Sequence, residues 1–350
     1  MWDGVNVAAL AQAFLDTLSK SASGYLSSRQ AGTVNYEHLF YLAKLVEDEL
    51  SRESLNPAFG DFVARTTRET ETIWKGLASP SWSGTTNDQL ASLAREAQVL
   101  IESVVRSQIG PEKKPRGYQA LLALLNDTDN FEHIDLVTLN HDLLLDWLME
   151  RENIDFYDGF SIRDGEVRLF DKAAPGVGGR VHLIKPPGAI NWHWFRLQPG
   201  DFSSDHHGIP DLGVSAWFAK RADGSLFRPL KGNPFFLTGV DKTVSYSTGI
   251  FGRQVAWFRR SLEQTNRVLC SGYGWRDAGM NDLLFEWLYS DRQHRLVLLH
   301  DTRRITPDIL SSPSPWVFRY QDLQDSGQLK IIPKWLCCWT GTAEILTALY

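Results

Sequence analysis

The first third of the chain carries apolar residues at the three- and four-residue intervals that are typical of amphipathic helices. Helices are predicted on this basis near the start of the chain, from about residue 35, over about 90–109 and over a short run at 121–125. No β-leaning alternation interrupts this pattern. We therefore expect residues 1–126 to form a helical region that packs on the remainder of the chain.

Beyond residue 126 the pattern changes to short apolar runs of strand length that alternate with helical stretches. The predicted strands are His133–Leu139, Arg180–Ile184, Arg267–Ser271, Leu296–Leu299 and 329–332. Strands that alternate with helices favour a parallel sheet. The predicted fold class is therefore α/β, with a Rossmann-like, open and mainly parallel sheet over residues 127–350. Residues 196–249 are rich in Gly, Pro, Asp and Ser, and we expect them to form an irregular, loop-rich insertion.

Three of the predicted strands end in loops that are rich in polar residues, glycine and aromatic residues. These loops are Thr138–Asp142, Pro187–Asn191 and Ser271–Asp277. In doubly wound folds the ligand binds outside the carboxyl ends of the strands. The pattern therefore predicts that the three loops surround one cleft.

Taken together and in this order, the three segments resemble the sirtuin-like domain family, in particular its bacterial branch of NAD-consuming defence proteins. The family has a Thr-x-Asn-x-Asp loop, a Lys-x-His-Gly-Ser-Ile-x-Trp segment and a Gly-Tyr-Ser/Gly-x-x-Asp-x-x-Ile-Asn segment. The matching residues here are Thr138, Asn140, Asp142, Lys185, Gly188, Ile190, Trp192, Gly272, Tyr273, Gly274, Asp277 and Asn281. The resemblance implies a Rossmann-like fold that binds NAD. In active members it implies hydrolysis of NAD to nicotinamide and ADP-ribose, in the service of antiphage defence.

Contacts with NAD are accordingly expected at nine residues, and Asn140 and His141 are the candidate catalytic residues. The nine are Thr138, Asn140, Asp142, Gly188, Ser271, Gly272, Tyr273, Asp277 and Asn281. Cleavage of the nicotinamide–ribose bond passes through a transition state that resembles an oxocarbenium ion, as sugar hydrolysis does. An amide such as that of Asn140 both donates and accepts hydrogen bonds, so it can orient a water molecule or the ribose hydroxyls.

Each of these residue types also has a purely structural interpretation. Asn140 and Asp142 could cap the following helix, and Asp277 could cap the helix that begins near Met280. Gly272 could serve only a tight turn. Ser271 could contact a phosphate, or it could be a small residue beneath the edge of the sheet.

The chain departs from the family pattern at two places. The family opens with a strand and a Gly-Ala-Gly-x-Ser loop around the NAD phosphates, and no segment here matches it, so we expect either a start codon further upstream or the loss of that strand. Pro187 stands where the family carries its catalytic His, and proline has no proton to exchange. Since a general base normally contributes about 10²–10⁴-fold, weak or absent turnover is expected unless a neighbour such as His141, His182 or His193 replaces it.

Composition and charge argue against several other classes of protein. Lys and Arg number 36 against 42 Asp and Glu, a net charge of −6, which disfavours a broad nucleic-acid surface. The three cysteines form neither a disulfide framework nor a zinc module, so a reducing cytoplasm is the expected location and protein deacylation is disfavoured. No apolar run is long enough to cross a membrane. The adjacent His206 and His207 lack the helical spacing of a ligand pair, and no metal is expected.

Two alternatives to an NAD hydrolase stay open. A catalytically degenerate sirtuin-like domain would keep the fold for binding a nucleotide, for oligomerising or for docking a partner. A structural subunit would work with a partner encoded in the same defence operon. The expected partners are thus NAD or ADP-ribose, a second copy of the chain, or that defence protein, and neither a membrane nor nucleic acid is expected.

Overall fold

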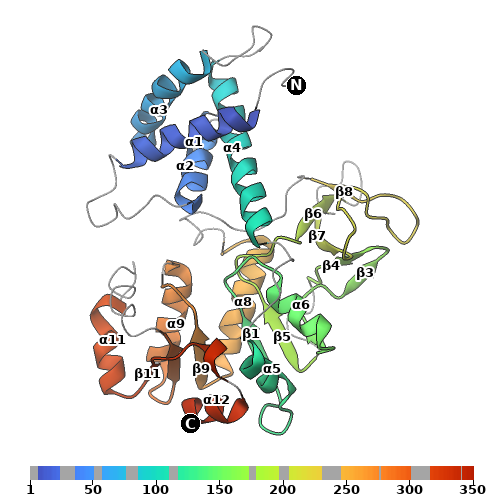
Figure 1. Cartoon of the computed structure of the whole chain (residues 1–350), viewed down its shortest axis with the longest axis vertical. Coiled ribbons are helices and arrows are strands. Elements are labelled where there is room, and N and C mark those ends of the chain that lie inside the picture. Colours follow the sequence, from blue (N-terminus) through green and yellow to red (C-terminus); the bar gives the residue numbers. More distant parts are fainter. Residues whose placement is uncertain are drawn as a thin grey trace. The chain divides into compact units, whose positions relative to one another are not determined.

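The computed structural model divides the chain into two compact units, with the boundary between Gln108 and Ile109. Figure 1 labels helices and strands of both units. The structure describes residues 7–23, 36–50, 57–75, 86–109, 117–172, 179–196, 205–230, 246–275, 277–300, 316–339 and 341–350.

The first unit is helical, as the periodicity predicts. Its helices are α1 (Val7–Ser23), α2 (Tyr36–Leu50), α3 (Pro57–Lys75) and α4 (Thr86–Ile109). One apolar core joins all four helices, and it is built around Phe14, Leu18, Val46, Val63 and Leu93. The sequence pattern did not predict α3, because two of its buried positions, Thr66 and Thr70, are threonines rather than apolar residues.

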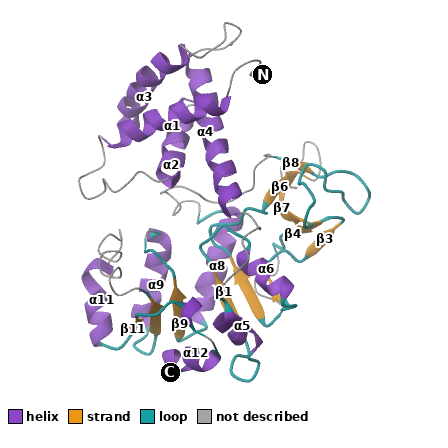
Figure 2. Cartoon of the chain, viewed as in Figure 1, coloured by secondary structure: helices purple, strands orange, loops and turns teal. Residues whose placement is uncertain are grey.

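The second unit holds two three-stranded parallel sheets (Figure 2). The first has the order β1 (Ile134–Val137), β5 (Val181–Ile184), β2 (Phe156–Tyr157). The second has the order β11 (Leu329–Ile332), β10 (Arg295–Leu299), β9 (Arg267–Ser271). Every pairing within both sheets is parallel. The α/β class with parallel sheets is therefore confirmed.

Helices cover both faces of these sheets. Alternate residues of a strand point to opposite faces. In β10, Leu296 and Leu298 join the core that includes α8 (Gly249–Glu263) and α9 (Ala278–Ser290). Val297 and Leu299 join a different core, which contains residues of α5 (Gln119–Asn126) and α12 (Thr342–Leu349). This double covering explains why β5 and β10 are nearly continuous runs of buried apolar residues.

The described residues of the second unit also form α6 (Leu144–Arg151), α11 (Trp316–Asp325) and a short 3-10 turn at Leu336–Cys338. Helix α6 follows β1, and α11 precedes β11 and packs on it. The predicted helical region ended at residue 126, whereas the compact units divide before α5. Helix α5 belongs with the sheets because its buried residues Ala120, Leu121 and Leu125 pack against their strands and against α12.

The region predicted as an irregular insertion contains ordered strands. An antiparallel sheet has the order β3 (Ile162–Asp164), β4 (Val167–Leu169), β7 (Asp205–Pro210), β6 (His193–Arg196), β8 (Arg228–Pro229). Strands β7 and β8 lie within residues 196–249, so the segment predicted to be loop-rich also contains short strands. The sheet has its own small core of Val167, Leu169, Phe195, Ala219 and Phe227. The strands are short and interrupted by Gly and Pro, so the sequence shows little alternation.

Candidate functional site

The first predicted loop continues β1 and then caps α6. The backbone N–H of Thr138 donates to the carbonyl of Ile184 at 3.0 Å, which extends the pairing of β1 with β5. Asp142 Oδ1 accepts the backbone N–H of Leu144 at 3.0 Å, so this carboxylate serves the start of α6. Asn140 is exposed. Its backbone N–H donates to the Thr138 hydroxyl at 3.2 Å. The side-chain amide of Asn140 therefore faces solvent.

The second predicted loop is buried and is locked to the first. Residues 185–190 are all buried. Gly188 has φ +80, a conformation that favours glycine, and its N–H donates to the carbonyl of Lys185 at 2.9 Å. The N–H of Ile190 donates to the carbonyl of His141 at 2.9 Å, and His141 Nδ1 lies 3.4 Å from the carbonyl oxygen of Gly188. The structure thus joins His141 of the first loop to Gly188 and Ile190 of the second.

Lys185 ties these two loops to the helices beneath them. Its ammonium group pairs with the carboxylate of Asp146 in α6 and donates to the carbonyl of Asp142 at 3.0 Å. Its backbone N–H donates to Gln254 Oε1 in α8 at 2.9 Å. Lys185 was matched to the family segment but was not predicted as a site residue, and nothing in the sequence links it to Asp146 or Gln254.

Pro187, which the resemblance aligns with a catalytic His, is buried and has no group that could exchange a proton. Pro187 lies within the buried second loop. The ring of His141 is also buried, with only 6% of the residue exposed. The other two candidate substitutes lie elsewhere: His182 is paired with Asp135 inside the parallel sheet, and His193 begins β6 of the antiparallel sheet. Of the three histidines, only His141 belongs to the predicted site.

The third predicted loop combines an exposed beginning with a tightly bonded end. Ser271, Gly272 and Gly274 are exposed, and Gly272 has φ +74. Asp277 caps α9 by accepting the N–H of Met280 at 3.1 Å, and its other oxygen accepts the hydroxyl of Tyr246 at 2.6 Å. Both carboxylate oxygens of Asp277 therefore have partners within the protein.

Tyr273 and Asn281 stabilise the third loop through buried hydrogen bonds. Asn281 is fully buried; its Nδ2 donates to the carbonyl of Trp275 at 2.9 Å, and its Oδ1 lies 2.7 Å from the Tyr273 hydroxyl. Burial, with the charge of Asp277 nearby, raises the pKa of Tyr273 far above its ordinary value, so this hydroxyl stays protonated. Trp275 adopts φ +58, which is unusual for a bulky residue, and its ring is buried. These residues fix the shape of the loop rather than offer free polar groups.

One apolar cluster joins the three loops. It includes Ala189 and Trp192 from the second loop and Trp275 from the third, and Leu139 and Tyr273 pack against it. The polar groups that this arrangement leaves open to solvent come from Asn140, Ser271 and the backbone around Gly272. Thr138 and Asp142 are partly exposed, while Gly188 and Asn281 are buried.

The strands that carry the outer two loops are the edge strands of their sheets. Strand β1 ends the order β1-β5-β2, and β9 ends the order β11-β10-β9. Their residues are only partly buried, in contrast to the buried central strands β5 and β10. Within the described residues no strand pairs with the outer edge of either.

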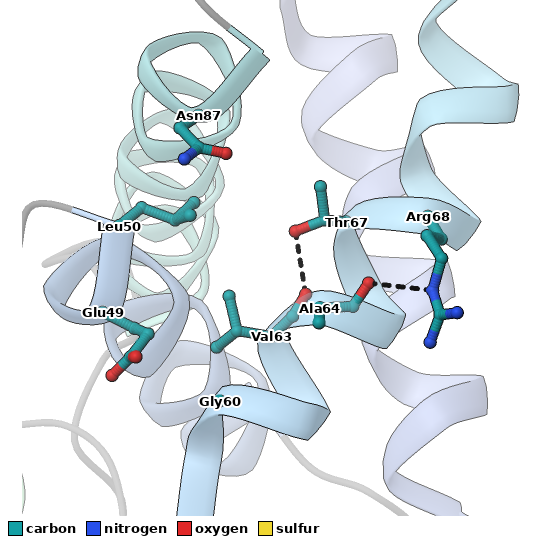
Figure 3. A pocket seen from close by; sticks show the side chains of 8 residues that line it. All are labelled: Glu49, Leu50, Gly60, Val63, Ala64, Thr67, Arg68 and Asn87. Atoms are coloured by element: carbon teal, nitrogen blue, oxygen red, sulfur yellow. Dashed lines mark hydrogen bonds between the residues drawn. The ribbon is translucent and has the colours of Figure 1, made fainter. Parts of the chain in front are cut away.

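A separate open pocket of about 660 Å³ lies in the first unit (Figure 3). Its lining comes from α2, α3 and the start of α4, and includes Glu49, Leu50, Val63, Arg68 and Asn87. Thr67 and Arg68 donate to carbonyls one turn earlier in α3. None of the predicted site residues lines this pocket.

Comparison of the chain with protein-family models and with curated proteins found no match. In the described part of the chain, no helix has the length and apolar character that a membrane span requires.

Proposed function

We propose that the second unit binds NAD or its product ADP-ribose at the carboxyl ends of its parallel strands. The observation that carries this proposal is the interlocking of the first two loops. His141 and Lys185 join them by backbone and side-chain bonds, and the shared apolar cluster adds the third loop. Loops at the carboxyl ends of parallel strands are the usual place for a nucleotide in doubly wound folds. The resemblance to sirtuin-like domains supplies the identity of the nucleotide.

The exposed polar groups are assigned to direct contact with the ligand. The Asn140 amide would bind the ribose hydroxyls, because an amide both donates and accepts hydrogen bonds. Ser271 and the open backbone at Gly272 suit a phosphate, which hydroxyl and N–H groups bind well. The partly or fully buried members of the predicted set hold these groups in place. We assign that supporting role to Thr138, Asp142, Gly188, Tyr273, Asp277 and Asn281.

The residues at the proposed site favour binding of NAD over its rapid hydrolysis. The resemblance places the general base at position 187, and proline cannot accept a proton there. His141 is the one histidine in the three loops, but its ring is buried against the second loop. We therefore place a catalytically degenerate domain ahead of a fast NAD hydrolase. Such a domain would act as a nucleotide-sensing or oligomerising subunit with a partner in antiviral defence.

Calorimetry with the full-length protein tests the binding. NAD and ADP-ribose are titrated into wild type, Asn140→Ala and Asn126→Ala. Asn126 is an exposed asparagine of α5 whose side chain bonds only within its own helix, so its variant is the matched control. We expect binding that weakens at least about tenfold in Asn140→Ala, the loss of about one good hydrogen-bonding group, and is unchanged in Asn126→Ala. Absence of binding to either nucleotide at millimolar concentration would refute the proposal.

Nicotinamide release distinguishes the two forms of the proposal. Wild-type protein is incubated with NAD, and free nicotinamide is measured over time. Little or no release agrees with a degenerate site. Rapid release that disappears in Asn140→Ala and persists in Asn126→Ala would instead establish a hydrolase, and His141→Ala would then show whether His141 provides the base.

A further inference from the structure

Two histidines and an aspartate converge on the α8 side of the first parallel sheet. Asp135 in β1 and His182 in β5 are opposite one another in the strand register. His182 Nδ1 lies 2.9 Å from Asp135 Oδ1, and His133 Nε2 lies 2.9 Å from the same oxygen atom. All three ligand atoms lie within 4.8 Å of one another.

The cluster is separate from the proposed nucleotide site. Asp135 is near the amino end of β1, and His133 precedes the strand, whereas Thr138–Asp142 follow its carboxyl end. The cluster could not be predicted from a short sequence motif, because His182 lies 47 positions after Asp135. It exists only because β1 and β5 pair in this register.

We propose that His133, Asp135 and His182 bind one divalent transition-metal ion, with Zn²⁺ as the best-matched metal. Two imidazole nitrogens and one carboxylate oxygen are typical zinc ligands. Magnesium and calcium instead prefer sets made of oxygen atoms. Each histidine would bind through the nitrogen that already faces Asp135, with its proton on the other ring nitrogen.

The surroundings of the cluster fit a site with one open position. The side chain of His133 is 43% exposed and that of His182 only 6%, so the cluster opens to solvent beside His133. Three protein ligands would therefore leave a fourth position for water, the arrangement of zinc sites that are not purely structural.

Neighbouring side chains hold one of the ligands, His182, in orientation. The ring of His182 packs edge-on against Trp257 of α8, with centroids 5.1 Å apart, and against Tyr157 of β2 at 5.9 Å. Such supporting contacts fix ring and carboxylate orientation in metal sites. His133 is the exposed ligand, and its ring packs edge-on against that of His182, with centroids 4.2 Å apart.

Metal titration of the full-length protein tests this proposal. Protein stripped with a chelator and dialysed is titrated by calorimetry with ZnCl₂, and with MgCl₂ for comparison. His133→Ala removes the exposed ligand, whose ring also contacts that of His182. His206→Ala is the matched control, because the His206–His207 pair is the competing pair of imidazoles. We expect one Zn²⁺ per chain, at least tenfold weaker binding in His133→Ala, unchanged binding in His206→Ala, and no Mg²⁺ binding.

Cobalt gives a second readout that does not depend on affinity alone. Co²⁺ bound by two nitrogens and one oxygen in a four-coordinate site gives a visible absorption band, and the band should be absent in Asp135→Asn and His133→Ala. No zinc binding by the wild type, or equal binding in His133→Ala, would overturn the proposal. These results are independent of NAD binding, which uses other residues.

Discussion

The ammonium group of Lys185 is paired with the carboxylate of Asp146 in the interior of the second unit. Lys185 is 2% exposed and Asp146 is 8% exposed. The lysine follows β5 and the aspartate lies in α6, and the same ammonium group also binds the carbonyl of Asp142. One buried cation therefore connects a strand end, a helix and the loop that carries Asn140.

Replacing Lys185 by methionine should destabilise the protein strongly. A methionine has a similar length, but it leaves the Asp146 carboxylate buried without its partner. Removing one member of a buried pair typically costs about 3–5 kcal/mol. Urea unfolding followed by circular dichroism measures the change in the free energy of unfolding.

The double variant Lys185→Met with Asp146→Leu supplies the control for that prediction. It removes both charges, so it should recover much of the stability that the single variant loses. Nucleotide binding should still be weaker than in wild type, because the bond that positions Asp142 is gone. A single variant that is as stable as wild type would contradict the buried pairing.

Asp277 should matter for stability as the N-cap of α9. Asp277→Ala removes the acceptor for Met280 N–H and for the Tyr246 hydroxyl, and loss of a cap costs about 1 kcal/mol. Asp277→Asn keeps a side-chain oxygen in the same place and should retain most of that stability. Unfolding of the two variants in urea makes the comparison, and equal stability of Asp277→Ala and wild type would exclude the capping role.

Two glycines of the third loop should respond differently to alanine. A Cβ at either Gly272 or Gly274 meets no atom within 4 Å, so neither variant creates a clash. Only Gly272 has a positive φ, of 74°, which costs a residue with a side chain about 1–2 kcal/mol. Gly272→Ala should therefore lower the midpoint of thermal unfolding, while Gly274→Ala leaves it unchanged or raises it slightly. The reverse order would show that the loop adopts another conformation.

His207 should make the second unit less stable in mild acid. Burial, with the positive charges of Lys172 and His206 nearby, lowers the pKa of His207 from 6.5 to about 4. As the pH falls below 6.5 the unfolded chain takes up a proton that the folded protein does not. Stability should therefore decline from about pH 6.5 and level off near pH 4. The total loss is at most about 3 kcal/mol, at 1.36 kcal/mol for each unit of pKa.

A phenylalanine at position 207 isolates this effect from other titrating groups. The His207 ring stacks on Trp194, with centroids 5.8 Å apart and an interplanar angle of 9°, and a phenyl ring can keep that stack. Free energies of unfolding are compared at pH 7 and pH 4.5 for wild type and His207→Phe. The decline on acidification should be smaller in the variant. An identical decline in both proteins would rule out His207 as the cause.

Periodicity predicted the elements that have strong apolar patterns. The runs at Val181–Ile184 and Leu296–Leu299 are buried on both faces, and their continuous apolar character predicted strands of a parallel sheet. Helix α3 was not predicted, because buried threonines look polar in the sequence even when their hydroxyls bond to the helix backbone, as that of Thr70 does to Thr66. Strands β7 and β8 were not predicted either, because their pattern is short and broken by Gly and Pro.

The sequence by itself determined the alternation of strands and helices, and hence which loops follow strand ends. This information is local, because a helix or strand with a buried face repeats its apolar residues at the period of that element. Tertiary structure alone decided which polar side chains bond within the protein and which stay exposed. Asp277, Asn281 and Asp142 have partners inside the protein, while Asn140 does not bury its amide. The pairing of Lys185 with Asp146, and of Asp135 with His182, depends on the packing and register of segments far apart in the chain, which no local pattern encodes.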